Sequence, residues 1–169
     1  MFAKLRQRWQ DARTIMKLSL DAEKRALQEG QQHPGAEHYM LAALDLPDGS
    51  ARRVFARIGA DPDAYRAALA DRHAAALNAI GLHATDAGGS AAPAAATALF
   101  DAQPSGQSLM QSLPELQRRL PAPLCGAHVL LAVAAMAHSA AGRAFKAIGI
   151  DLQALGSAAE AELRAGMPA

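Results

Sequence analysis

Residues 37–64 (EHYMLAALDLPDGSARRVFARIGADPDA) return ninety positions later as residues 127–154 (AHVLLAVAAMAHSAAGRAFKAIGIDLQA). The two stretches align without a gap and share ten identities in 28 positions. Only three of the ten matches are alanine, and most of the ten fall at apolar or helix-capping positions. We infer an internal duplication, for which the alternative is coincidence in an alanine-rich chain.

Around the repeated stretch, apolar residues recur every three or four positions between turn residues, a pattern typical of short α-helices. We expect helices over residues 12–29, 36–45, 50–58 and 62–79. The first should carry one apolar stripe, made by Ile15, Met16, Leu18, Leu20, Ala22, Ala26 and Leu27. Gly59 and Gly149 take structural roles, because glycine commonly ends a helix.

Residues 83–97 (HATDAGGSAAPAAAT) contain almost no large side chains and are predicted to be a linker, either a surface loop or a hinge. This divides the chain into repeat one, residues 12–82, and repeat two, residues 98–165. Four short helices alone would enclose a thin core. The predicted fold is therefore all-α, with two pseudo-repeated four-helix units packed as a single domain over residues 1–169.

Composition excludes several classes of protein. Seventeen basic and sixteen acidic residues give a net charge of +1, which argues against a nucleic-acid binder. One cysteine excludes an intramolecular disulfide framework. The most apolar run, residues 127–137, is far shorter than the roughly 20 residues that a membrane span needs. We expect a cytoplasmic protein without a membrane span.

The segment Gly35–Leu44 (GAEHYMLAAL) resembles the G-T-E-H-L-L-L-A-L-L segment of the Clp N-terminal domain family. The turn at 47–49 (PDG) and residues 51–61 (ARRVFARIGAD) are similar to that family too. The family carries this repeat twice, joined by a linker, in a small all-α domain of two pseudo-repeated four-helix units. The resemblance covers residues 12–80 well and residues 98–163 more loosely.

In most members of that family the domain leads a Clp unfoldase. The chain has no G-x-x-x-x-G-K-[ST] phosphate loop and no G-x-S-x-G motif. We therefore expect no catalytic residue, no cofactor and no metal. The resemblance implies a protein-interaction module, an accessory or regulator of Clp-type proteolysis, whose partner is a Clp chaperone or protease subunit, an adaptor or a substrate segment. The alternative is a repurposed scaffold that binds a partner helix in a secretion-related or regulatory complex.

Glu37 is the strongest candidate for a charged binding contact. In certain Clp N-domains the glutamate at this position receives the guanidinium of a phosphorylated arginine, which the resemblance transfers to Glu37 with Ala36 beside it. The second glutamate of the family falls at Ala127, and its threonine is replaced by Ala36 and Gly126. At most one half could therefore keep a phospho-arginine site. The alternative role of Glu37 is to complement the helix dipole.

The remaining candidates have simpler interpretations. His38 and His128 lack metal-ligand partners at helical spacing, and we expect both to be structural, partly buried and bonded to backbone. Phe2 and Trp9 lie in a basic leader and, with Phe100, could form a partner-binding patch, although helix packing would also explain them. Cys125, without a resolving cysteine, is expected to be a buried, inert thiol.

Overall fold

The computed structural model describes residues 2–79 and 102–167, and within them it contains eight α-helices and no strand. This confirms the predicted all-α class. The predicted linker, residues 83–97, and Phe100 lie outside the described residues. The helices are α1 (Phe2–Gln28), α2 (Ala36–Leu44), α3 (Ser50–Arg57), α4 (Pro62–Ala79), α5 (Pro104–Arg119), α6 (Gly126–Ala134), α7 (Ala140–Ala147) and α8 (Leu152–Ala165).

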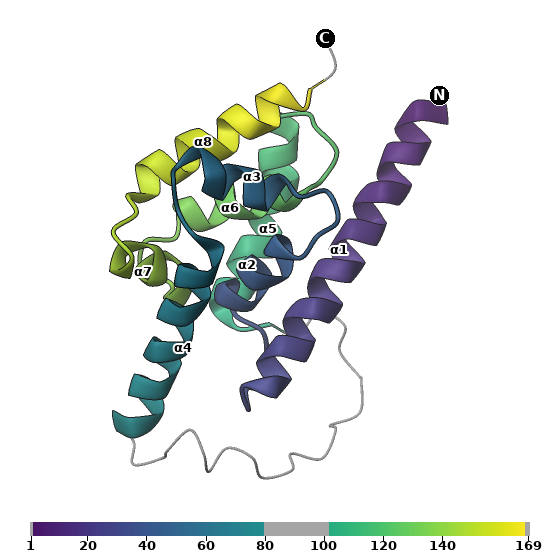
Figure 1. Ribbon diagram of the computed structural model, residues 1–169. Coiled ribbons are helices and arrows are strands. Elements are labelled where there is room, and N and C mark those ends of the chain that lie inside the picture. The colour runs from purple at the N-terminus through teal and green to yellow at the C-terminus, as the bar shows by residue number, and fades with distance from the viewer. Residues whose placement is uncertain (1, 80–101, 168–169) are drawn as a thin grey trace.

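The two repeats pack into each other rather than side by side. Helices α2 and α6, the second helices of the two repeats, contact each other at the centre of the bundle. The last helix of each repeat packs on the third helix of the other, so that α4 lies on α7 and α8 lies on α3 (Figure 1). This exchange gives the bundle a pseudo-twofold arrangement.

Three aromatic rings form the centre of the core. Phe55 and Phe145, equivalent in the two repeats, are fully buried with ring centroids 5.5 Å apart. Tyr65 packs its ring 4.3 Å from that of Phe145, centroid to centroid, and its hydroxyl donates to the Ala141 carbonyl at 3.4 Å. Because Phe55 and Tyr65 come from repeat one and Phe145 from repeat two, the repeats share one core.

Equivalent glycines end the third helix of each repeat. Gly59 and Gly149 have φ angles of +63° and +78°, in the left-handed region where a side chain is disfavoured. The residue after each turn then donates its amide back to a phenylalanine carbonyl: Ala60 to Phe55, and Ile150 to Phe145, both at 3.0 Å. These closures turn the chain toward α4 and α8, and they explain why both glycines recur in the duplication.

Helix α1 differs from the prediction in two respects. It begins at Phe2 rather than near residue 12, because residues 2–29 contain no glycine or proline and are rich in strong helix formers. The predicted single stripe also separates into two faces: Leu18, Ala22 and Ala26 are buried, whereas Met16, Leu20 and Leu27 are exposed. The spacing was helical for both sets, but they lie on different sides of the helix.

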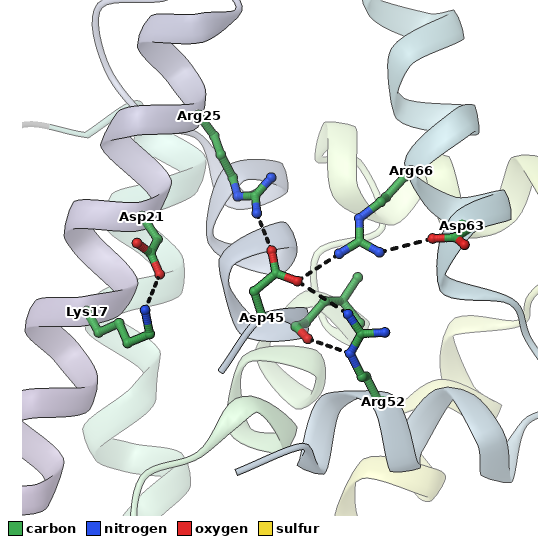
Figure 2. Close-up of polar contacts among 8 residues, drawn as sticks. Lys17, Asp21, Arg25, Asp45, Arg52, Asp63 and Arg66 are labelled. Carbon is green, nitrogen blue, oxygen red and sulfur yellow. Dashed lines mark hydrogen bonds and ion pairs between the residues drawn. The ribbon is translucent and has the colours of Figure 1, made fainter. Parts of the chain in front are cut away.

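An aspartate at the end of α2 joins three helices. Asp45 accepts ion pairs from Arg25 of α1, from Arg66 of α4 at 2.9 Å and from Arg52 of α3 at 3.4 Å (Figure 2). Arg52 also donates through Nε to the Leu44 carbonyl at 2.9 Å. All four side chains are partly exposed, so each ion pair alone contributes little to the stability of the fold. Together they fix the orientation of α1, α3 and α4 around the end of α2.

Candidate functional site

A cleft of about 180 Å³ lies where repeat one meets repeat two. Its walls come from the start of α2, from one side of α4 and from α7. Charged side chains from all three helices line it: Glu37 from α2, Arg72 from α4 and Arg143 from α7, with His73 next to Arg72. With Glu29, which follows α1, the cleft places two carboxylates and two guanidinium groups around one small volume.

Glu37 is held close to the backbone at the start of α2. Its side chain is only 13% exposed, and its carboxylate lies directly over Gly35. A Cβ at Gly35 would stand 2.6 Å from Glu37 Oε2, so glycine leaves the space that the carboxylate occupies. Ala36 is fully buried, and its amide donates to Ser105 Oγ at 3.1 Å. A ligand would thus meet the Glu37 side chain, whereas the Ala36 amide is already occupied.

A buried histidine supports this end of the cleft. His38 is fully buried rather than partly so; its Nδ1 accepts from the Gly35 amide at 2.9 Å, which leaves the proton on Nε2. Nε2 then donates to Glu29 Oε2 at 3.2 Å. Partial burial alone would raise the pKa of Glu29, but the hydrogen bond from His38 and the nearby charge of Arg25 lower it below its usual value. Glu29 stays ionised and helps to line the cleft.

The pseudo-twofold arrangement produces a second cleft, of about 190 Å³, in the equivalent place. Arg53 stands there where Arg143 stands in the first cleft, and Glu162 takes the position of Arg72. Arg53 Nε donates to Glu162 Oε1 at 2.5 Å, and Arg57 Nε donates to Glu162 Oε2 at 3.0 Å. Burial raises the pKa of Glu162, but the hydrogen bonds from the two arginines outweigh it and lower that pKa. The charges of the second cleft are therefore satisfied within the chain.

The start of α6 is also occupied by the chain itself. The Ala127 amide donates to Ser50 Oγ at 2.9 Å, and the Gly126 amide faces both Asp48 carboxylate oxygens at 3.4 Å. A Cβ on Gly126 would stand 2.9 Å from the Ala51 Cβ and 3.0 Å from the Ala43 carbonyl oxygen. The second cleft thus lacks the glutamate, and the helix start beside it is covered by Asp48, Ser50 and Ala51.

Sequence reasoning found Glu37 but missed Arg72, Arg143 and Glu162. A signal for them was present, because the offset of ninety residues continues into the last helix of each repeat. Carried that far, it pairs Arg72 with Glu162 and His73 with Leu163. That comparison would have shown a change of charge sign at one equivalent position, although not which side chains meet across the repeats.

Cys125 and His128 lie together at the start of α6 without forming a reactive pair. Cys125 Sγ stands 3.4 Å from His128 Nδ1, and the same nitrogen accepts from the Cys125 amide at 3.3 Å. Burial raises the pKa of the thiol and lowers the pKa of the fully buried imidazole. Both groups are neutral near pH 7, which is the opposite of a thiolate–imidazolium nucleophile.

Of the three aromatic side chains predicted to form a partner-binding patch, the structure places that of Trp9. Trp9 is exposed on α1 and is absent from the cleft wall. Phe2 is the first residue of α1, and Phe100 lies outside the described residues. Across residues 2–79 and 102–167, no three histidine, cysteine, aspartate or glutamate side chains group as metal ligands. In the same residues, no helix has the length and apolar character to cross a bilayer.

Comparison with known protein families identifies the family of the chain. The sequence model of the Clp repeat (R) N-terminal domain matches residues 16–113, which is more than half of the chain. The chain therefore belongs to the Clp repeat N-terminal domain family, a family of protein-interaction modules. No curated protein matches the chain. The match begins at residue 16, so the first half of α1 lies outside the part that the family model describes.

Proposed function

We propose that this chain is a non-catalytic binding module that captures an arginine-bearing segment of a protein partner in the cleft between its repeats. The partner would be a substrate, an adaptor or a subunit of a Clp chaperone–protease, and the chain acts as an accessory or regulator of that system. The observation that carries the proposal is the cleft itself, where Glu37 stands with Arg72 and Arg143.

The chemistry of the cleft suits a phosphorylated arginine side chain. A carboxylate holds a planar guanidinium through two parallel hydrogen bonds, which is the role assigned to Glu37. Arginine side chains bind phosphate in the same bidentate manner, which is the role assigned to Arg72 and Arg143. A ligand with a cationic plane next to a phosphate thus finds a partner for each charge. Ordinary arginine would add a third guanidinium beside Arg72 and Arg143 and would bring no phosphate for them to bind.

The second cleft supports the assignment by contrast. Its arginine is already paired with Glu162, and Ala127 replaces the glutamate. The proposal therefore has one binding site in a duplicated domain. The alternative, a groove for a partner helix, is less well supported here, because such grooves are apolar and this cleft is lined by charged side chains.

A binding titration tests the proposal. A fluorescent peptide that contains one phospho-arginine would be titrated with wild-type protein and with Glu37→Gln, which removes the charge and keeps the shape. We expect the dissociation constant to rise about tenfold or more, the usual cost of losing a charged hydrogen-bond pair. Glu115→Gln is the control, since Glu115 is an exposed glutamate on α5 that pairs only with Arg118.

The comparison peptides decide the ligand class. Peptides with unmodified arginine or with phosphoserine should bind much more weakly than the phospho-arginine peptide. Equal binding of all three peptides, or equal binding by wild type and Glu37→Gln, would show that the cleft is not the site.

A further inference from the structure

The most exposed apolar surface of the molecule runs along α1. In the part of the chain that the structure describes, every large hydrophobic side chain that is exposed belongs to this helix. They are Leu5 at 56%, Trp9 at 68%, Met16 at 57%, Leu20 at 48% and Leu27 at 52%. We call these five residues the α1 stripe. The buried face of α1, with Leu18, Ala22 and Ala26, is separate from it, so the stripe is not needed for the bundle core.

The spacing of the α1 stripe keeps it straight. Leu5, Trp9 and Ala12 are followed eleven residues later by Met16, Leu20 and Glu23, and then by Leu27. An eleven-residue period corresponds to about 3.67 residues per turn, close to the 3.6 of a straight helix. The stripe therefore runs nearly parallel to the helix axis, from Leu5 to Leu27 of α1.

Unpaired positive charge surrounds the exposed end of the stripe. Helix α1 contains seven basic and three acidic residues, in a chain whose total charge is +1. Lys4, Arg6, Arg8 and Arg13 are exposed and form no ion pair with other described residues. Asp11, the acid among them, is turned toward the bundle, where it accepts from the Leu124 amide at 2.8 Å. The complementary surface must be anionic as well as apolar.

Helix α1 lies away from α4 and α7, the helices that carry the two arginines of the proposed binding cleft. In Figure 1 the helix stands at one edge of the bundle, while α4 and α7, which wall the cleft, stand at the other. A surface that covers the α1 stripe would not cover Arg72 or Arg143.

We propose that α1 docks this protein reversibly on the surface of an anionic phospholipid membrane. The helix lies in the plane of the interface, with the α1 stripe in the boundary between headgroups and acyl chains. Arg6 and Arg13, which flank the stripe at helical spacing, then contact lipid phosphates. The leucine, methionine and tryptophan side chains supply the apolar contact, and the charges supply selectivity for anionic lipid. The rest of the bundle, with its cleft, faces the solvent.

Trp9 is the single tryptophan of the chain and reports directly on this contact. The full chain would be mixed with unilamellar vesicles of phosphatidylglycerol and phosphatidylcholine in equal parts, or of phosphatidylcholine alone. We expect a blue shift of Trp9 emission and co-sedimentation with the anionic vesicles only, both weakened by salt. Absence of a shift with anionic vesicles would overturn the proposal.

Two variants and a control separate the parts of the interaction. Leu5→Ser/Met16→Ser/Leu20→Ser should abolish binding, and Arg6→Glu/Arg8→Glu/Arg13→Glu should weaken it about tenfold or more. The control is Arg118→Glu/Arg119→Glu/Arg164→Glu, which makes the same charge change on exposed arginines of α5 and α8. Circular dichroism would verify that all three variants remain folded.

Two outcomes of this comparison would contradict membrane docking. Equal loss in the control would mean that net charge, and not α1, governs the binding. The protein could instead form a dimer without lipid, with Trp9 emission shifted to the blue. If the serine substitutions then returned it to a monomer, a second copy of the chain would be the partner that covers the stripe.

Discussion

Gly35 determines where the Glu37 carboxylate lies. The backbone of Gly35 has φ −95° and ψ 178°, which any residue can adopt, so the glycine is not needed for conformation. It is needed for space, because the carboxylate of Glu37 occupies the position next to the missing side chain. The absence of a side chain at Gly35 thus determines the position of the Glu37 carboxylate in the cleft.

Gly35→Ala is therefore expected to affect binding more than folding. The added Cβ would stand 2.6 Å from the end of a flexible side chain, which can rotate away at small cost. We expect affinity for the phospho-arginine peptide to fall roughly tenfold, with the urea midpoint of unfolding almost unchanged. Unchanged affinity in this variant would show that the Glu37 position over Gly35 has no role in binding.

At the residue scale, the sequence predicted the identity of Glu37 but not the state of its neighbour. Ala36 was assigned to the site because it begins a helix whose amides are free in isolation. The Ser105 hydroxyl, 69 positions along the chain, takes that amide in the folded protein. No local pattern indicates a contact of that sequence separation.

At the scale of elements, Gly126 allows three helices to meet. It begins α6, and a side chain there would meet both the Ala43 carbonyl of α2 and the Ala51 backbone of α3. Backbone atoms cannot rotate away as the Glu37 carboxylate can. Close approach of α6 to α2 and α3 therefore requires glycine at this position.

Gly126→Ala should accordingly destabilise the fold. Overpacking against backbone costs about 1–3 kcal/mol of unfolding free energy. Urea unfolding monitored by circular dichroism measures the loss, and Gly156→Ala on α8 is the control, since a Cβ there would have ordinary contacts at 3.4 Å and beyond. A Gly126→Ala protein as stable as wild type would contradict the close junction of α2, α3 and α6.

The helices themselves were predictable because their causes are local. Caps such as Asp61 and Asp151, the glycines after α3 and α7, and the periodic apolar residues all lie within a few positions of what they determine. Helix α1 was the exception. Its exposed stripe has the same spacing as a core stripe, and sequence alone does not state which face the bundle covers.

At the scale of the whole molecule, Glu162 joins the two repeats. It lies on α8 and is buried between Arg53 and Arg57 of α3. Because its pKa in the folded state is lowered from 4.5, its contribution to stability is present above that value. The contribution is lost as the pH falls through the lower, folded-state pKa.

Glu162→Gln should cost about 1 kcal/mol of unfolding free energy near pH 7. The difference in unfolding free energy from wild type should shrink once the pH falls below the folded-state pKa of Glu162. The wild-type carboxyl group is then protonated and neutral, like the amide of the variant. Urea titrations at pH 7 and at a pH below the folded-state pKa measure this difference. Asp63→Asn is the control, since Asp63 is an exposed carboxylate, 84% exposed, that pairs with Arg66. A difference that stays constant with pH would mean that the ion pairs do not stabilise the fold.

The duplication predicted a shared architecture, but the loss of symmetry between the clefts depended on side chains brought together from both repeats. Arg72 and Arg143 line one cleft, whereas Glu162 and Arg53 pair in the other. The exchange of α4 and α8 between the repeats creates both juxtapositions. A sequence comparison of the repeats shows that Glu162 replaces Arg72, but it does not show that Glu162 pairs with Arg53.

The most direct measurement is a calorimetric titration of the phospho-arginine peptide into wild type and into Arg72→Glu. This variant gives the first cleft the charge arrangement of the second. In the second cleft, Glu162 neutralises Arg53; in the variant, a glutamate at position 72 would neutralise Arg143 in the same way. The account predicts one site per chain in wild type and no binding by Arg72→Glu, with Arg118→Glu, at an exposed arginine of α5, retaining the site. Two sites per chain, or undiminished binding by Arg72→Glu, would contradict it.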